Sequence, residues 1–411
     1  MKKLIYFLFF VLIILSAVFI IVFLNNHTSK TSNDSSIDAT KNDNTYSKSQ
    51  AISKKEENTT TARIVANGDL LYHDILYMSA RTGDSYDFSK NYEYVKDFIS
   101  KADLAIADYE GTINPEWPLS GYPLFNAPPE LVNFIKDAGY DCVTLAHNHI
   151  LDSGIDGIKS TAKYFNDVGI DIFGVSPNKP RSENDILIKE VNGIKIALLS
   201  YCYGFNGIEA TISEKDYNDY LYDLNEEKIK AEIERAEKIA DITIVFPHMG
   251  VEYMLTPTDE QVKLYDNMVK WGADIILGGH PHVAQPTKTI DINDEKKFII
   301  YSMGNFISNQ RIETIDNKWS ERGVLVDLTI EKNNNKTTIS AIKLHPTWVS
   351  KTSKGIRGPE GFELFDYSTL ICEDVINNRE KYSFITENNF NRIKSAYNEL
   401  NELLNLDPIW K

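Results

Sequence analysis

From Ile275 to Gln285 the chain reads I-I-L-G-G-H-P-H-V-A-Q, an apolar run followed by two glycines and two histidines one residue apart. The run Ile275–Leu277 has the length and composition of a buried strand. In open α/β sheets the carboxyl ends of the strands converge on one crevice, where ligands bind. This stretch therefore predicts a sheet that delivers His280 and His282 to a binding site.

The same pattern recurs along the chain. Six more apolar runs predict buried strands, at Arg63–Asn67, Leu104–Ala107, Cys142–Ala146, Ile194–Ser200, Ile242–Phe246 and Phe298–Ser302. Helical spacing is present at Pro129–Ala138, Gly154–Asn166, Glu226–Ala240 and Thr258–Trp271, the last opening with a capping sequence, and at Phe384–Leu404. Two later strands, Gly323–Ile330 and Thr337–Leu344, are joined by a polar turn. The order predicts an α/β protein with a mixed sheet or two packed sheets.

Five of the predicted strands end in residue types that bind metals. Taken alone, each is as readily a turn former, a solvated carboxylate or a core imidazole, but their combination at converging strand ends is far more specific. Oxygen and imidazole ligands without thiolate suit Mn, Fe or Zn, and a carboxylate shared by two such ions would make a two-metal hydrolytic site. The residues are Asp69, Glu110, Asn148, His149, His248, His280 and His282.

Composition excludes several classes of protein. The chain has 411 residues, with 43 Lys and Arg against 59 Asp and Glu, and a net charge of −16. This argues against a nucleic-acid binder, because affinity for phosphate backbones depends on clustered basic residues. Three scattered cysteines, at 142, 202 and 372, make neither a disulfide framework nor a CxxC site.

The N-terminal region differs from the rest. Leu4 to Leu24 is an uncharged apolar run long enough to cross about 30 Å of hydrocarbon, with no cleavage site after it. We expect residues 1–24 to form a cytoplasmic stub and an uncleaved transmembrane helix. Lys2 and Lys3 place the N-terminus in the cytoplasm and the remaining chain outside the cell membrane. Residues 25–61 are polar and are expected to be a disordered tether.

The polar loops carry a resemblance to a known family. The series is Gly68-Asp69, Tyr109-Glu110-Gly111, His147-Asn148-His149, His248-Met249-Gly250, Gly279-His280-Pro281-His282 and Tyr301 to Phe306. From about Arg63 to Gln310 it resembles the CapA family of bacterial capsule or poly-γ-glutamate synthesis proteins. That family is similar to calcineurin-like metallophosphoesterases, whose fold is a β-sandwich flanked by helices with a dinuclear metal centre. The resemblance implies this fold for residues 62–350, with a C-terminal helical extension over 351–411.

The resemblance also implies roles for the polar residues. Two divalent transition-metal ions, Mn, Fe or Zn, would be held by Asp69, Glu110, Asn148, His248, His280 and His282. Glu110 would bridge them, and His149 would meet the leaving or attacked group. The phosphoesterase pattern has a histidine where this chain has Leu71, and His73 is the alternative donor.

Four further candidates lie next to these positions. His147 stands where a glycine is usual, and either tunes the site or faces solvent. Asp152 and Glu252 are candidates for carboxylates that orient ligands, although Asp152 is equally suited to cap a helix. Asn305 is expected to shape the pocket.

Two functions are compatible with this pattern. The resemblance implies a membrane-anchored, extracytoplasmic component of poly-γ-glutamate-type capsule synthesis or export, with a metal-dependent hydrolase or transferase site. Its partners would be a membrane ligase, a small membrane subunit and the anionic polymer, and no nucleic acid. The alternative is a non-catalytic scaffold that binds metal and polymer, which the leucine at position 71 favours somewhat.

Overall fold

The computed structural model describes residues 59–182, 184–334, 336–359 and 361–410. The predicted transmembrane helix and the tether up to residue 58 lie outside the described residues. No helix in the described part is both long and apolar enough to cross a membrane. Residues 56–411 form one compact unit that contains all the cores described below, so this unit is expected to fold independently.

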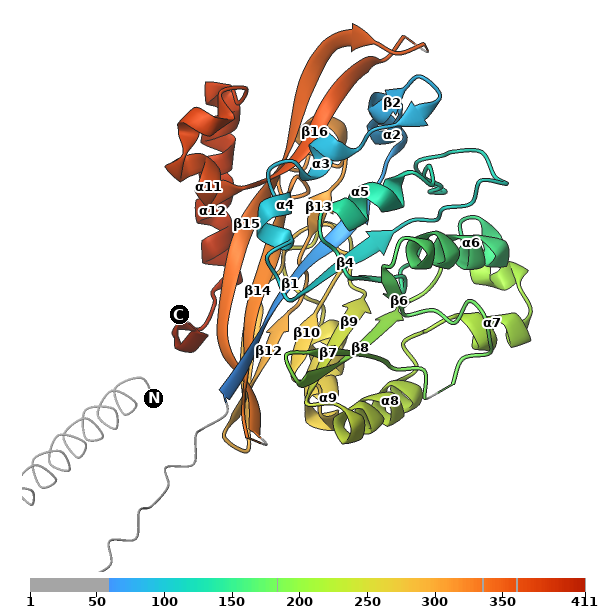
Figure 1. The fold of residues 1–411 in the computed structure, drawn as a ribbon, viewed down its shortest axis with the longest axis vertical. Helices are drawn as coiled ribbons and strands as arrows, with labels where there is room; N and C mark the ends of the chain where they lie inside the picture. The colour runs from blue at the N-terminus through green and yellow to red at the C-terminus, as the bar shows by residue number, and fades with distance from the viewer. Residues whose placement is uncertain (1–58, 183, 335, 360, 411) are drawn as a thin grey trace, which may run out of the picture. The chain divides into compact units, whose positions relative to one another are not determined.

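The compact unit contains two large sheets (Figure 1). The strands of the first are β1 (Thr59–Leu71), β4 (Leu104–Glu110), β5 (Cys142–Thr144), β6 (Asp171–Phe173), β13 (Asn305–Ile307), β14 (Arg322–Asn333), β15 (Lys336–Arg357) and β16 (Glu363–Ile371). Those of the second are β7 (Leu187–Val191), β8 (Ile194–Cys202), β9 (Ile242–His248), β10 (Ile275–Leu277), β11 (Thr287–Ile292) and β12 (Glu295–Ile300). The orders are β16-β15-β14-β1-β4-β5-β6, with β13 also beside β1, and β11-β12-β10-β9-β8-β7. A separate hairpin joins β2 (Arg81–Thr82) to β3 (Ser85–Tyr86).

Alternating burial shows that the sheets pack face to face. On β1, Ile64 and Ala66 belong to a core shared with the second sheet, whereas Val65 belongs to the core on the opposite face. On β8, Ile196 likewise lies between the sheets and Ala197 lies on the outer face. The predicted α/β sandwich of two packed sheets is therefore confirmed.

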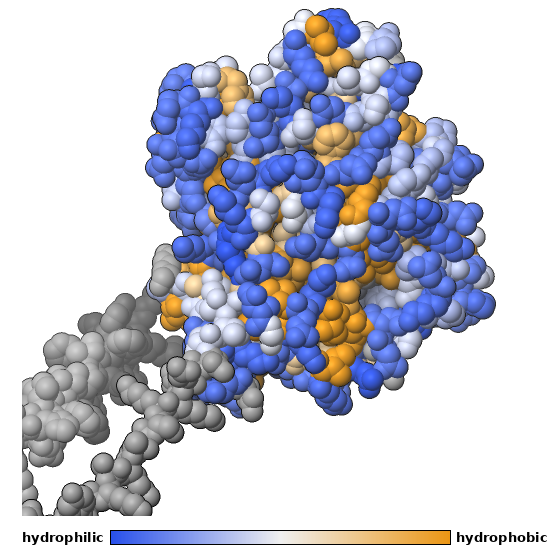
Figure 2. All heavy atoms as spheres, in the orientation of Figure 1, coloured by the Kyte–Doolittle hydropathy of each residue, from blue (hydrophilic) through white to orange (hydrophobic). Residues whose placement is uncertain are grey.

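Helices cover both outer faces of the sandwich. The outer core of the first sheet includes α2 (Asp74–Ala80), α3 (Ser89–Tyr92), α4 (Lys96–Ile99), α5 (Leu131–Asp137), α6 (Gly154–Asp167) and the edge of α7 (Glu214–Tyr220). The second sheet is covered by α8 (Glu226–Ile239) and α9 (Asp259–Trp271). A short α10 (Ile312–Ile315) precedes β14, and three 3-10 turns span Ile208–Thr211, Arg379–Tyr382 and Pro408–Trp410. On the face drawn in Figure 2 the surface is mostly hydrophilic, with smaller hydrophobic areas between.

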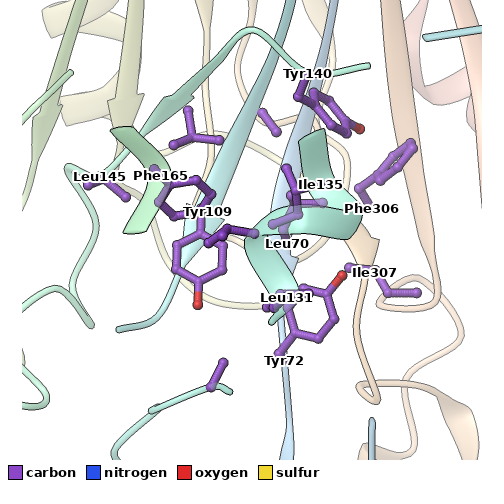
Figure 3. Close-up of a cluster of buried hydrophobic side chains, with 14 of the residues drawn as sticks. Leu70, Tyr72, Tyr109, Leu131, Ile135, Tyr140, Leu145, Phe165, Phe306 and Ile307 are labelled. Carbon is purple, nitrogen blue, oxygen red and sulfur yellow. The ribbon is translucent and has the colours of Figure 1, made fainter. Parts of the chain in front are cut away.

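The outer core fixes the strands that lead to the polar loops. Figure 3 shows Tyr109 and Phe165 side by side, with ring centroids 4.9 Å apart. The hydroxyl of Tyr140 donates to Oδ1 of Asn67 at 2.5 Å, and both groups are buried. These contacts hold the ends of β1 and β4 just before Asp69 and Glu110.

The chain differs from expectation at two boundaries. Thr59 to Thr61, expected in the tether, belong to β1 because they pair with Glu331 to Asn333 of β14. Position 350 lies inside β15, and β16 belongs to the same sheet, so helices account for only part of residues 351–411. In that part α11 (Cys372–Asn377) and α12 (Glu387–Leu404) share a core with Trp348 of β15.

Helix α9 begins with the capping arrangement expected from the sequence. The N–H of Gln261 donates to the Thr258 hydroxyl at 3.1 Å, and the Gln261 side chain accepts from the N–H of Thr258 at 2.9 Å. The amide nitrogen of Gln261 also donates to the carbonyl oxygen of Met249, next to His248. We expect Thr258→Ala to lower the free energy of unfolding by about 1 kcal/mol in denaturant titrations. The neighbouring exposed Thr256→Ala is the control, and an equal loss in both variants would contradict a capping role.

Candidate metal centre

The site forms where parallel strands of both sheets end. On β4, Leu104 and Ile106 face the core between the sheets, and Asp108 and Glu110 continue the same alternation at the end of the strand. The end of β9 supplies His248, which bridges to Gly279 after β10. The loops predicted from strand ends therefore converge on one place.

A β-bulge aims Asp69 at this place. The pairing of β1 with β4 shifts by one residue between Asn67 and Asp69, so that Asp69 lies opposite Asp108. Without the extra residue, Asp69 would point to the same face as Val65, towards the helices. A Cβ on Gly68 would stand 2.1 Å from the carbonyl oxygen of Gly304, so only glycine allows this close approach.

The loop after β10 presses against the carboxylates. His280 and His282 both have positive φ angles, 94° and 56°, a conformation that is uncommon outside glycine. A Cβ on Gly279 would lie 2.7 Å from Oδ2 of Asp108 and 3.1 Å from Oδ1 of Asp69. The glycine lets the backbone pass beside two carboxylates and turns the histidines toward them.

His282 lies within reach of two carboxylates and one amide. Its Nδ1 is 3.0 Å from Oδ2 of Asp69, 3.1 Å from Oδ1 of Asn305 and 3.7 Å from Oε2 of Glu110. Asn305 is held in turn by its donation to the carbonyl oxygen of Ser320. Asp69, Glu110 and His282 thus offer atoms close enough to hold one metal ion.

His248 contacts a second group of side chains of the kinds that bind metal ions. Its Nε2 is 2.9 Å from Oδ1 of Asn148 and 3.8 Å from Oε1 of Glu110. Its Nδ1 is 2.9 Å from Oδ2 of Asp108. Glu110 therefore lies between His248 and His282, one carboxylate oxygen toward each.

The carboxylates are buried without a lysine or arginine partner in the described part of the chain. Asp69, Asp108 and Glu110 are at most 3% exposed, and in the described part of the chain their ion-pair partners are histidines alone. One oxygen of Asp69, one of Asp108 and both of Glu110 have no hydrogen-bond partner. Buried charges are normally paired or coordinate metals. These orphaned oxygens fit divalent cations.

The pKa values reflect the same excess of negative charge. Burial, together with the Asp69 carboxylate, raises the pKa of Glu110 to about 7. Burial by itself lowers the pKa of His282, yet Glu110 and Asp69 raise it to about 10. The cluster therefore attracts positive charge strongly.

His149 lies beside Glu110 with its ring held in place. Its Nδ1 is 2.7 Å from Oδ2 of Asp152, its ring is edge-on to Phe125 at 4.7 Å, and its Nε2 is 4.0 Å from Oε1 of Glu110. Asp152 also accepts from the N–H of Phe125 at 2.6 Å. The partners of Asp152 are thus His149 and this loop, rather than the first turn of α6.

Two other histidines are buried against the cluster. The expectation that His147 could face solvent is wrong, because its side chain is 0% exposed. It lies under the loop that follows β4, where its Nε2 accepts from the N–H of Gly111. The His280 ring lies 4.5 Å from that of Tyr203 and 5.1 Å from that of His248. Its Nδ1 has no partner, and burial lowers its pKa well below the usual value.

The remaining candidates line a pocket of about 300 Å³ that reaches His149 and His282. His73 is half-buried there, with its Nδ1 accepting from the N–H of Asn309 at 3.4 Å. Glu252 is exposed on the pocket wall. In the described part of the chain two groups offer atoms close enough to hold a metal ion, Asp69 with Glu110 and His282, and Asp69 with Asp108 and His248. Neither His73 nor Glu252 belongs to them, and Leu71 is buried on the pocket wall.

Sequence reasoning missed Asp108. The predicted strand ended at Ala107, which made Asp108 the first loop residue, whereas β4 continues to Glu110. The signal in the sequence was the two-residue spacing of Asp108 and Glu110, because residues two apart on a strand face the same way.

The sequence matches the family described as bacterial capsule synthesis protein PGA_cap over residues 63–310, more than half of the chain. The chain belongs to this family. It is 34% identical over 189 residues to the capsule biosynthesis protein CapA of Bacillus anthracis, covering 45% of this chain and 44% of that one. It is 29% identical over 275 residues to the PGA biosynthesis protein CapA of Bacillus subtilis, covering 64% and 68%. The match thus spans under half of the first relative's length.

Solved structures of phosphoesterases are more distant. The calcineurin-like phosphoesterase YfkN from Bacillus subtilis aligns with a TM-score of 0.40 and 17% identity, over 70% of this chain and 90% of that one. A putative 5'-nucleotidase from Staphylococcus aureus aligns with a TM-score of 0.43 and 15% identity, over 69% and 54%. Similarity at this level assigns no reaction to this chain.

The buried charge has a measurable cost. Because the folded-state pKa of Glu110 is raised from 4.5 to about 7, the metal-free protein is destabilised above pH 7 and relieved of this cost below pH 4.5. We expect Glu110→Gln to raise the free energy of unfolding of chelator-treated protein at pH 8, with a smaller gain toward pH 4.5, because the amide has no charge to bury. Denaturant unfolding at both pH values measures this, with exposed Glu116→Gln as control. A variant less stable than the wild type at pH 8 would contradict the argument.

Proposed function

We propose that this protein carries a metal-dependent hydrolase or transferase site that acts in the synthesis or export of a poly-γ-glutamate-type capsule polymer. The observation that carries the proposal is Glu110, whose two unpartnered oxygens lie between His248 and His282. A shared carboxylate in this position is what a two-metal hydrolytic site requires. Membership of the capsule synthesis family supports the biological context.

The proposed ligands form two overlapping sets. Asp69, Glu110 and His282 would hold the first ion, and Glu110, Asn148, His248 and His280 the second. The donor atoms of each set already lie together, with Nε2 of His248 2.9 Å from Oδ1 of Asn148 and Nδ1 of His282 3.0 Å from Oδ2 of Asp69. Asp108 would orient the His248 imidazole, because it contacts Nδ1 and leaves Nε2 for the ion. Mn, Fe or Zn suits this set of ligands.

The chemistry divides between the ions and the chain. When bound, two such ions lower the pKa of a water molecule and polarise a phosphorus or carbonyl centre. His149 would donate a proton from Nε2 to the leaving oxygen, because Asp152 occupies its Nδ1. Asn206 accepts from the side-chain amide of Asn148 at 3.2 Å and would help to fix the orientation of that amide.

We also propose the location and partners expected from the sequence. The apolar run from Leu4 to Leu24 would anchor the protein, with its N-terminus in the cytoplasm and the site outside the cell membrane. A membrane ligase and a small membrane subunit would be its partners in capsule synthesis. Cations in the cleft would offset the repulsion between an anionic polymer and a chain of net charge −16.

Metal content tests the proposed ligands. We expect elemental mass spectrometry to find two transition-metal ions per wild-type chain. His282→Ala, which removes the contact to Asp69 and Glu110, should lose at least one ion, and Asp108→Asn should lower metal affinity 10- to 100-fold. His345→Ala, far from the cluster in sequence, is the control. Equal metal content in wild type and His282→Ala would remove the basis of the proposal.

His149 separates catalysis from scaffolding. We expect His149→Ala to keep both ions and to reduce polymer production by 10²- to 10⁴-fold, since a positioned acid contributes that much to rate. Asp152→Asn should show a smaller loss, because the imidazole remains. Production is measured in cells that carry each variant in place of the wild type. Full production by His149→Ala with both ions bound would favour the non-catalytic scaffold.

A further inference from the structure

Exposed hydrophobic residues gather around the pocket. Of the twelve large hydrophobic side chains that are exposed in the described part of the chain, seven lie in three short segments that supply the pocket wall. We call these seven the apolar rim: Trp117, Tyr122, Leu124, Val251, Met254, Ile312 and Ile315. Isolated surface hydrophobics are ordinary, but a contiguous group beside a site marks a surface that contacts an apolar ligand.

Sequence neighbours tie the rim to the pocket. Tyr122 and Ile315 line the pocket themselves. Leu124 precedes the lining residue Phe125, and Val251 and Met254 flank the lining residues Glu252 and Tyr253. Two rim residues therefore line the cavity whose wall carries His149 and His282, and the other five lie in the segments that supply the same wall.

The pocket wall offers no fixed positive charge. Glu252 is its one residue with a charged side chain, apart from the histidines, and the neutral amides of Asn309 and Gln310 complete the polar wall. Arg311, next in the chain, is occupied by Glu313 at 2.6 Å and by the carbonyl oxygen of Val349. Lys351 hydrogen-bonds to Asn309 and lies over the Phe365 ring. A ligand portion that carries many carboxylates would find no ion-pair partner here.

We propose that the substrate of this site is an amphiphile, a phosphate monoester that carries an apolar chain. Its head group would meet the carboxylate and histidine cluster, and its chain would lie across the apolar rim. This inference rests on the proposed function, because it assigns a substrate class to the same site. It differs from an interaction of the whole face with a bilayer, because Tyr122 and Ile315 of the rim line a pocket that also contains His149 and His282.

The reaction balances without a further reactant. The oxygen of water forms a bond to phosphorus, and the bond from phosphorus to the alkyl oxygen breaks. The leaving oxygen takes a proton from Nε2 of His149, and water supplies a proton in return. The products are inorganic phosphate and the long-chain alcohol.

The test compares alkyl phosphates of increasing length. Metal-loaded protein comprising residues 56–411 is given ethyl, hexyl or dodecyl phosphate below the micelle concentration, and kcat/KM is measured from phosphate release. We expect kcat/KM to rise about fourfold for each methylene that reaches the rim, and at least 30-fold from ethyl to dodecyl phosphate.

Rim variants show whether this gain depends on the named residues. In the triple variant Leu124→Ser, Val251→Ser and Ile312→Ser, the ratio of kcat/KM for dodecyl over ethyl phosphate should fall at least tenfold. The double variant Ile239→Ser and Ile409→Ser changes exposed hydrophobics elsewhere and should keep the wild-type ratio. A far-UV circular dichroism spectrum equal to the wild type confirms that each variant is folded.

The outcomes distinguish a failure of the proposed substrate class from a failure of the proposed hydrolase activity. Turnover of ethyl and dodecyl phosphate with the same kcat/KM would overturn the amphiphile and leave the hydrolase standing. If no ester is turned over by protein that holds two ions, the hydrolase fails, and dissociation constants for the same esters then test the rim alone. Loss of binding to phosphatidylglycerol vesicles in the rim variant, with an unchanged chain-length ratio, would overturn the proposal in favour of membrane docking.

Discussion

Three carboxylates buried at the ends of β1 and β4 are the constraint on which the rest of the site depends. Their charge has no lysine or arginine partner in the described part of the chain, so the fold retains them at a cost in free energy. The surrounding structure holds the three carboxylates in place despite this cost. Asp69 is turned inward by a bulge, Glu110 is fixed by a fully buried strand, and Gly279 brings the histidine loop against Asp69 and Asp108.

The sandwich explains why these groups meet at all. Parallel strands in each sheet end on the same side, and the face between the sheets changes from apolar to ionic at that end, as β4 shows from Leu104 to Glu110. A site between two sheets is shielded from solvent on most sides. Low local dielectric strengthens every interaction with a bound cation, and it also makes an unpaired carboxylate expensive. Affinity for metal and a loss of stability without metal would thus both follow from this one arrangement.

Local patterns predicted what depends on local forces. The apolar run Ile275–Leu277 coincides with β10, and the capping sequence at Thr258 marks the start of α9. Contacts distant in sequence were not predictable in this way. The bulge that aims Asp69 depends on Gly304, and alternation counted from Ile64 would have turned that carboxylate toward the helices. The polar second half of β15 is a strand because β16 pairs with it, which places the expected boundary at 350 inside a sheet.

The surface and the cluster suggest how an acidic protein handles an anionic substrate. Long-range attraction is unavailable at a net charge of −16, and salt screens what remains beyond about 8 Å. Two divalent ions would more than neutralise the three carboxylates, but only at contact distance. Affinity at the pocket mouth must then come from a force insensitive to charge, and the apolar rim offers apolar burial. A ligand with one anionic group and one apolar portion would contact both the ions at the cluster and the apolar rim, whereas a free polyanion would contact only the ions.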